Sequence, residues 1–100
     1  MDTSFAEYVA DQVGELGEVR IKKIFSSYGL YLGETFFGIV NEGVLYLKTN
    51  PETAKKYQAV GMGPFTPSQD QVLKNYLEVP PEIIDDKDQL VAYVEEACGV

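Results

Sequence analysis

The sequence predicts a two-layer α+β domain, in which an antiparallel sheet of about five strands carries the N- and C-terminal helices on one face. Two observations predict this fold class. Apolar residues recur at helical spacing near both ends of the chain, and between them they form short runs separated by turn residues. The runs follow one another too closely for crossover helices, which makes neighbouring strands antiparallel. The chain has 100 residues, and we expect residues 1–100 to form one domain.

The first predicted element is a helix over residues 4–16. Ser4 with Glu7 three residues later matches a capping box, in which each side chain satisfies a free backbone N–H at the start of a helix. Gly17 is a typical residue for the end of this helix. The apolar residues that share one face of it are Phe5, Tyr8, Val9, Val13 and Leu16.

Four strands are predicted next, because the apolar pattern changes to short runs between turn residues. The runs occupy residues 20–25, 29–33, 35–40 and 44–48. Ser, Gly and Asn residues between the runs favour tight turns, so the strands are expected to form a four-stranded meander.

The glycines of this region have a functional and a structural interpretation. Gly33 and Gly38 have the spacing of a phosphate-binding loop, which needs Lys and then Ser or Thr directly after its last glycine. Ile39 and Val40 occupy those positions, so the groups that would hold phosphate and magnesium are missing. We therefore expect Gly29, Gly33 and Gly43 to supply positive φ at turns, and Gly38 to mark a bulge or a close approach within a strand.

A second helix is predicted over residues 51–60. Asn50 can cap it, and Pro51 suits the first helical position because the N–H that proline lacks has no partner there in any case. Gly61 is expected to end the helix. Residues 61–69 contain two glycines and two prolines, and we interpret them as a loop.

A fifth strand and a final helix complete the predicted fold. The strand covers residues 71–79, and a short turn follows at residues 80–84. Asp86 with Gln89 three residues later repeats the capping pattern, and Gly99 marks the end of the helix. The apolar stripe of this helix consists of Leu90, Val91, Val94, Ala97 and Cys98.

The composition is acidic, with 16 acids against 8 bases and a net charge of −8. Such a field repels nucleic acids and anionic lipids, so we expect neither direct nucleic-acid binding nor a membrane partner. Arg20, Lys22 and Lys23 form the only dense basic patch in the sequence. Its simplest interpretation is the solvated face of a strand, and its alternative is contact with a few DNA phosphates.

The sequence offers no recognisable catalytic set, and we expect no enzymatic activity, no cofactor and no metal site. There is no histidine, which excludes the usual general base and most transition-metal sites. Asp85, Asp86 and Asp88 lack the pattern of a calcium loop, and helix capping explains them more simply. Cys98 is interpreted as an inert core thiol because no cationic residue lies near it in the sequence.

A cytoplasmic location is expected on two grounds. Cys98 is the only cysteine, so no internal disulfide forms, which suits a reducing compartment. The N-terminal residues also lack the basic cluster of a secretory signal.

Aromatic residues are frequent on the predicted strands, and they leave two interpretations open for the sheet face away from the helices. They either pack as a core or form a partner-binding surface, because large exposed apolar patches mark interaction sites. The residues are Phe25, Tyr28, Tyr31, Phe36, Phe37 and Tyr46.

Three stretches, in this order, resemble the N-terminal domain of the TfoX/Sxy proteins: RIKKIFSSYGLYLGETFFGIVNEGVLYLKTN, AVGMGPF and YLEVPPEIIDD. The residues that carry the resemblance are Phe25, Tyr28, Gly29, Leu45, Tyr46, Leu47, Lys48, Gly61, Met62, Phe65, Tyr76, Val79 and Pro80. The resemblance implies a two-layer α+β fold and a bacterial or archaeal origin. Full-length members of that family regulate natural competence, are thought to act with the cAMP receptor protein at promoters, and carry a second, C-terminal domain. This chain is expected to be a stand-alone N-terminal domain.

The leading hypothesis from the sequence is a non-enzymatic protein-interaction module in transcriptional regulation. Its partner would be a protein such as a transcription factor or a second copy of the chain. The candidate contact residues are Arg20, Lys22, Lys23, Tyr28, Tyr31, Phe36 and Tyr46. The alternative hypothesis is a small-molecule-binding protein or enzyme with a pocket between the sheet and the helices.

Overall fold

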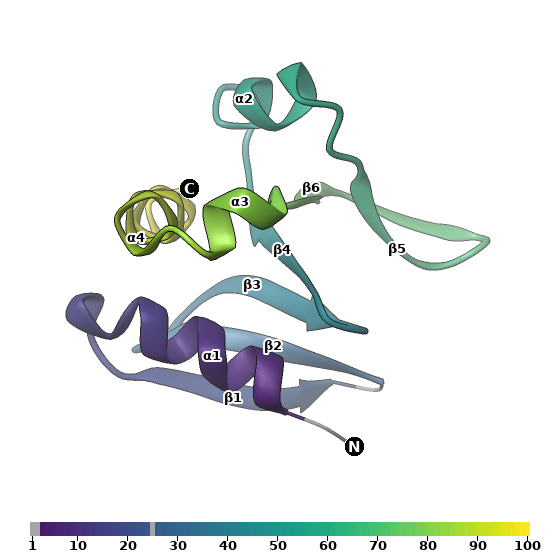
Figure 1. Cartoon of the computed structure of the whole chain (residues 1–100). Coiled ribbons are helices and arrows are strands. Elements are labelled where there is room, and N and C mark those ends of the chain that lie inside the picture. The colour runs from purple at the N-terminus through teal and green to yellow at the C-terminus, as the bar shows by residue number, and fades with distance from the viewer. Residues whose placement is uncertain (1–2, 25) are drawn as a thin grey trace.

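Four strands in the first half of the chain form the predicted antiparallel meander (Figure 1). The computed structural model describes residues 3–24 and 26–100. The four strands are β1 (Val19–Ile24), β2 (Ser27–Leu32), β3 (Thr35–Asn41) and β4 (Val44–Lys48). Strands β2, β3 and β4 each pair antiparallel with the strand that precedes them in the chain. Phe25, which the sequence places at the end of the first strand, lies outside the described residues.

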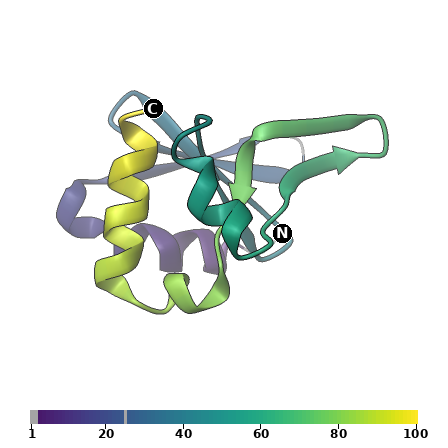
Figure 2. The same cartoon turned by 90° about the horizontal axis from the view of Figure 1, so that it is seen from above.

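Over residues 3–24 and 26–100 the sheet has six strands, one more than the sequence predicts. The residues interpreted as a loop contain β5 (Pro64–Ser68), which forms a hairpin with β6 (Gln71–Glu78). Strand β6 also pairs with β4, so the strand order is β1-β2-β3-β4-β6-β5. Prolines are tolerated in β5 because an edge strand needs hydrogen bonds on one side alone. Figure 2 shows this hairpin extending away from the helices.

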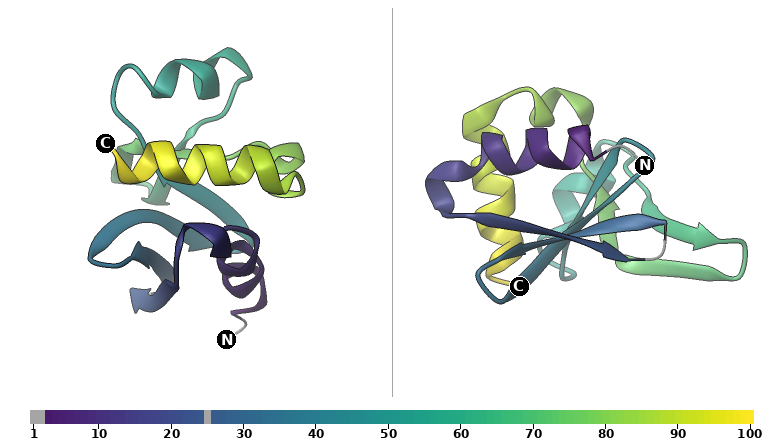
Figure 3. Two further views of the ribbon diagram at one scale, coloured as in Figure 1. Left: turned by 90° about the vertical axis from the view of Figure 1, so that its left-hand side faces the viewer. Right: turned by 90° about the horizontal axis from the view of Figure 1, so that it is seen from below.

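The helices cover one face of the sheet, as the sequence predicts (Figure 3). Helix α1 (Ser4–Gln12) packs against β1, and α4 (Lys87–Cys98) packs against β3 and β4. The short helix α3 (Pro81–Ile84) leads into α4. Helix α2 (Ala54–Ala59) joins this layer through its buried Tyr57, whose ring lies 5.4 Å from that of Tyr93 in α4.

The first helix is shorter than predicted, and its predicted capping box is wrong. Regular α-helix ends at Gln12, and Gly14–Leu16 form a single 3-10 turn, η1. Glycine lowers helix stability, which explains a change of geometry at this point. The N-cap residue is Thr3 rather than Ser4, and its side chain makes no capping hydrogen bond.

The capping pattern predicted for the last helix is confirmed. The carboxylate of Asp86 accepts a hydrogen bond from the backbone N–H of Gln89 at 3.2 Å and one from the Gln89 side chain at 2.8 Å. Regular α2 begins at Ala54 rather than at residue 51, but the predicted cap at Asn50 is confirmed. Its side-chain oxygen accepts hydrogen bonds from the N–H groups of Glu52 and Thr53, in the turn that precedes α2.

The core lies between the sheet and the helices, and the apolar stripes predicted for the two terminal helices contribute part of it. Fully buried side chains meet there from both layers. The sheet contributes Leu30, Phe37, Leu45 and Leu47, and the helices contribute Val9, Val13, Leu90 and Val94.

A bulge in β3 determines which residues enter this core. Phe36 pairs with Tyr31 and Gly38 pairs with Leu30, so Phe37 has no partner of its own on β2. Phe37 and Gly38 therefore lie on the core side in succession. A side chain at Gly38 would meet the backbone oxygen of Tyr46 at 2.9 Å, which confirms the close approach predicted there.

The other glycine predictions are confirmed in two of three positions. Gly33 and Gly43 have φ of 63° and 76° in the turns after β2 and β3. Gly29 does not lie in a turn, because β2 begins at Ser27 and includes it. Its role is a close approach, since an added Cβ would lie 2.6 Å from Ile24 and 2.9 Å from Phe36.

Replacing Gly38 with alanine is expected to lower the free energy of unfolding by about 1–3 kcal/mol, because β3 and β4 must separate to admit the methyl group. Urea unfolding followed by far-UV circular dichroism measures this change. Gly14→Ala is the control, since nothing lies within 4 Å of a Cβ at that position. An equal loss in both variants would contradict the close contact.

Asp86→Ala is expected to lower the melting temperature at pH 7. The hydrogen bonds from the Gln89 side chain and backbone hold the pKa of Asp86 below its ordinary value of 3.8. A depressed carboxylate pKa stabilises the fold above the unfolded value, and this stabilisation is lost as the pH falls through the folded value. The difference between Asp86→Ala and the native chain should therefore shrink below pH 3.8.

Asp86→Asn is the matched control for this cap. Asparagine caps helices as well as aspartate does but does not titrate. Its melting temperature at neutral pH should stay close to that of the native chain. A deficit of Asp86→Ala that is the same at every pH would show that the carboxylate charge contributes nothing.

Candidate functional site

The sheet face opposite the helices, which we call the open face, carries a row of aromatic and basic side chains. In the described part of the chain no helix lies on it (Figure 3). Directly paired residues of antiparallel strands share a face, and Arg20 pairs with Tyr31, which pairs with Phe36. The row consists of Arg20 and Lys22 from β1, Tyr31 from β2, Phe36 from β3, Tyr46 and Lys48 from β4, and Tyr76 from β6.

The aromatic rings of the open face are in contact with one another. The centroids of Tyr31 and Phe36 are 5.0 Å apart, and those of Phe36 and Tyr76 are 5.7 Å apart. Tyr46 stacks against Phe65 of β5 at 4.7 Å. Aromatic pairs at such separations stabilise a sheet by about 0.5–1.5 kcal/mol each. The rings are therefore held in place before any partner arrives.

Arg20 extends this cluster at the β1 end. Its guanidinium carbon lies 5.7 Å from the ring centroid of Tyr31, and its Nη2 donates to the backbone oxygen of Gly33 at 3.0 Å. A cation over an aromatic face is held by the ring quadrupole. The positive charge thus has a fixed position beside the rings.

Two tyrosines of this face, Tyr46 and Tyr76, are neutral at physiological pH, and burial raises their pKa further above the ordinary value of 10.0. Burial raises the pKa of Tyr46, with Glu78 and then Glu42 adding to the effect. Burial also raises the pKa of Tyr76, to which Tyr31 adds. Both phenol groups can donate a hydrogen bond to an acceptor on a partner.

Five of the seven residues predicted as contacts lie on the open face, and two do not. Tyr28 is 8% exposed and belongs to the core beneath the helices. Lys23 pairs with Tyr28 and so projects to the helix side of β1. Strand alternation thus divides the basic patch, with Arg20 and Lys22 on one face and Lys23 on the other.

Tyr76 and Phe65 belong to the aromatic cluster, and the sequence analysis did not select them as contacts. Leu77 is buried in the core, and strand alternation puts Tyr76 on the other side of β6. Phe65 had no such signal, because its strand was interpreted as a loop.

One known family matches most of the chain. The model of the TfoX N-terminal domain matches residues 11–100, which include all six strands. This chain belongs to the TfoX N-terminal domain family. The resemblance seen in the sequence is thereby confirmed. No curated protein matches the chain.

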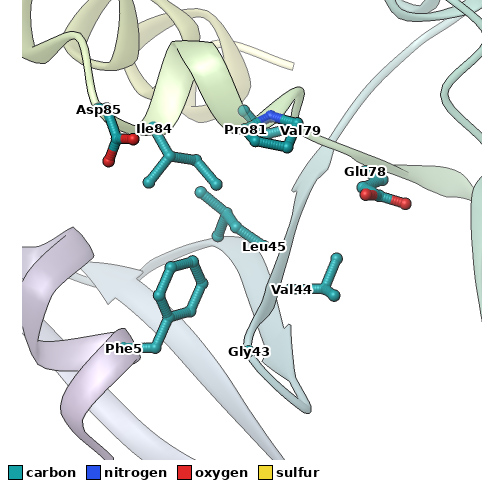
Figure 4. A pocket seen from close by; sticks show the side chains of 9 residues that line it. All are labelled: Phe5, Gly43, Val44, Leu45, Glu78, Val79, Pro81, Ile84 and Asp85. Carbon is teal, nitrogen blue, oxygen red and sulfur yellow. The ribbon is translucent and has the colours of Figure 1, made fainter.

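This TfoX N-terminal domain has a hollow where the alternative hypothesis places one, between sheet and helices (Figure 4). Its volume is about 260 Å³. Phe5 from α1, Leu45 from β4 and Ile84 from α3 lie around its centre, which makes it mostly apolar. The carboxylates of Asp85 and Glu78 lie on opposite sides of it rather than together.

The thiol and carboxylate groups outside this hollow show no arrangement typical of a reactive or metal-binding site in the described part of this TfoX N-terminal domain. Cys98 is half-buried at the end of α4, where burial and then Glu95 raise its thiol pKa and so reduce its reactivity. Over residues 3–24 and 26–100, no three carboxylate or thiol groups gather as metal ligands. No helix in the same ranges is long and apolar enough to cross a membrane.

Gly29→Ala is expected to disturb the aromatic cluster of this domain, because the new methyl group would collide with Ile24 and with the Phe36 ring. Near-UV circular dichroism should lose tyrosine signal, and the free energy of unfolding should fall by about 1–3 kcal/mol. Gly63→Ala is the control, since a Cβ there meets nothing within 4 Å. An unchanged near-UV spectrum would mean that the cluster is not packed as described.

Proposed function

We propose that this TfoX N-terminal domain is a non-enzymatic protein-interaction module and that the open face contacts its partner. The proposal rests chiefly on the aromatic cluster. Tyr31, Phe36, Tyr46 and Tyr76 are each only half-buried, although they are ordered by mutual contact. Rigid aromatic side chains next to arginine are the residues that dominate binding energy at protein interfaces.

The distribution of charge supports an acidic contact surface on the partner. Residues 4–18 and 81–98, which form most of the helix layer, hold ten of the 16 acids and only one base, Lys87. The open face carries the bases Arg20, Lys22 and Lys48. The acid Glu78 lies on the same face, where it pairs with Tyr46. Complementary charges orient two proteins as they meet, so an acidic, apolar surface fits the open face.

Membership of the family supports a proposal for the biological process in which the module acts. Because the chain is a TfoX N-terminal domain, we propose that the partner is a protein of transcriptional regulation, as for the competence regulators of the TfoX/Sxy type. The net charge of −8 argues against the nucleic acid itself as the ligand. We place this activity in the bacterial cytoplasm.

A photo-crosslinking amino acid at Tyr46 identifies the partner in cells, and the same group at Tyr8 is the control. Tyr8 is 42% exposed but lies on α1, in the helix layer. The protein captured from Tyr46 and not from Tyr8 is then purified for binding measurements. Capture of the chain itself, with a dimer in analytical ultracentrifugation, would identify a second copy as the partner.

Lys22→Glu is expected to weaken binding of the purified partner by about tenfold or more, because it reverses a charge at the contact. Lys23→Glu is the matched control, since it makes the same change one residue away on the opposite side of β1. Isothermal titration calorimetry measures both. Equal effects of the two variants, or none, would contradict the open face as the binding surface.

A further inference from the structure

Strand β1 is an edge of the sheet that remains available for pairing. In the described residues β2 is its one strand neighbour, so the backbone N–H and C=O groups on its other side lack a ladder partner. The opposite edge, β5, contains Pro64 and Pro67, which have no N–H to donate. An added strand therefore finds a better hydrogen-bonding edge at β1.

Two hollows flank β1, one on each side of the sheet, and Ile21 lines both. The hollow on the open face is bordered by Arg20, Lys22 and Tyr31. The guanidinium of Arg20 is already fixed there by Gly33 and Tyr31. A side chain that enters this hollow meets two positive charges, which favours a carboxylate.

The hollow on the helix side has different chemistry. It lies between α1 and β1, and Ala10, Val19 and Ile21 give it an apolar floor. Acidic residues surround that floor at Glu7, Asp11 and Glu18. A carboxylate is repelled there, whereas an aliphatic side chain covers the exposed parts of Val19 and Ile21.

We propose that the edge of β1 binds an extended segment of a partner protein as a seventh strand. Every second residue of that segment is acidic and faces Arg20 and Lys22. The residues between them are aliphatic and face Val19 and Ile21. This inference rests on the proposed function, because it specifies how the partner of the open face would continue onto the adjacent edge. The different chemistry of the two sides also fixes the register, since a slip by one residue puts acids into the acidic hollow.

A second copy of the chain suits this edge poorly. Antiparallel pairing of two β1 strands keeps the open faces on the same side. Arg20 and Lys22 of both copies would then lie next to one another, and like charges on neighbouring strands are destabilising. The occupant is therefore a segment with acids where β1 has bases.

A capped peptide of alternating glutamate and valine tests the proposal with the intact chain. We expect it to bind at least about tenfold more tightly than a scrambled peptide of the same composition in fluorescence anisotropy. A third peptide has the same sequence but carries N-methyl groups on the alternate backbone nitrogens that would face β1. It keeps every charge and cannot complete a ladder, so it should bind as weakly as the scrambled peptide.

Amide hydrogen exchange locates the bound peptide. Residues 19–24 should gain protection with the alternating peptide and not with its N-methylated form. The double variant Arg20→Glu, Lys22→Glu should lose binding, whereas Lys23→Glu should keep it within about twofold. Equal binding of the N-methylated peptide, no binding at millimolar concentration, or dimerisation of the free chain through β1 would each overturn the strand addition.

Competition separates this inference from the proposed function. A partner captured at Tyr46 should be displaced by the alternating peptide if its segment occupies β1. A partner that stays bound under saturating peptide, yet is weakened by Lys22→Glu, would leave the open face as the binding surface and refute pairing at the edge. The absence of any partner at Tyr46 would refute the proposed function, whatever the peptide does.

Discussion

The bulge in β3 is the constraint on which both faces of the sheet depend. It places Phe37 and Gly38 on the core side in succession, and this is sterically feasible because Gly38 has no side chain to meet the backbone of Tyr46. Phe37 then fills the core beneath the helices, while Phe36 turns outward to Tyr31 and Tyr76. Without the bulge, regular alternation would put Phe36 and Ile39 on opposite faces of the sheet.

The regular elements of the fold were predictable because short-range chemistry determines them. Strand β4 has the predicted bounds, and the Asp86 cap forms with Gln89 as expected. Strand β5 was not predictable in this way. Its two prolines and the glycines just before it indicate a loop, and the segment becomes a strand through pairing with β6, a tertiary effect that outweighs local preference.

The candidate surface was predictable in its composition and less so in its geometry. The sequence selected Tyr31, Phe36 and Tyr46 as candidate contacts, and all three lie on the open face. It also selected Tyr28, which the structure buries at 8% exposure, because β2 begins two residues earlier than predicted and Tyr28 becomes a strand residue facing the helices. The predicted strand began at Gly29, so Tyr28 lay outside it and strand alternation could not assign this side chain to a face.

The two edges of the sheet differ in a way that limits how the protein can assemble. Sheets that present a competent edge on both sides can polymerise, since each added copy exposes a new edge for the next. Here the two prolines of β5 prevent a further strand from pairing along that edge of the sheet. Any assembly that grows by backbone pairing from β1 therefore closes after a single addition, and the protein can use an open strand for recognition while being protected against fibre formation.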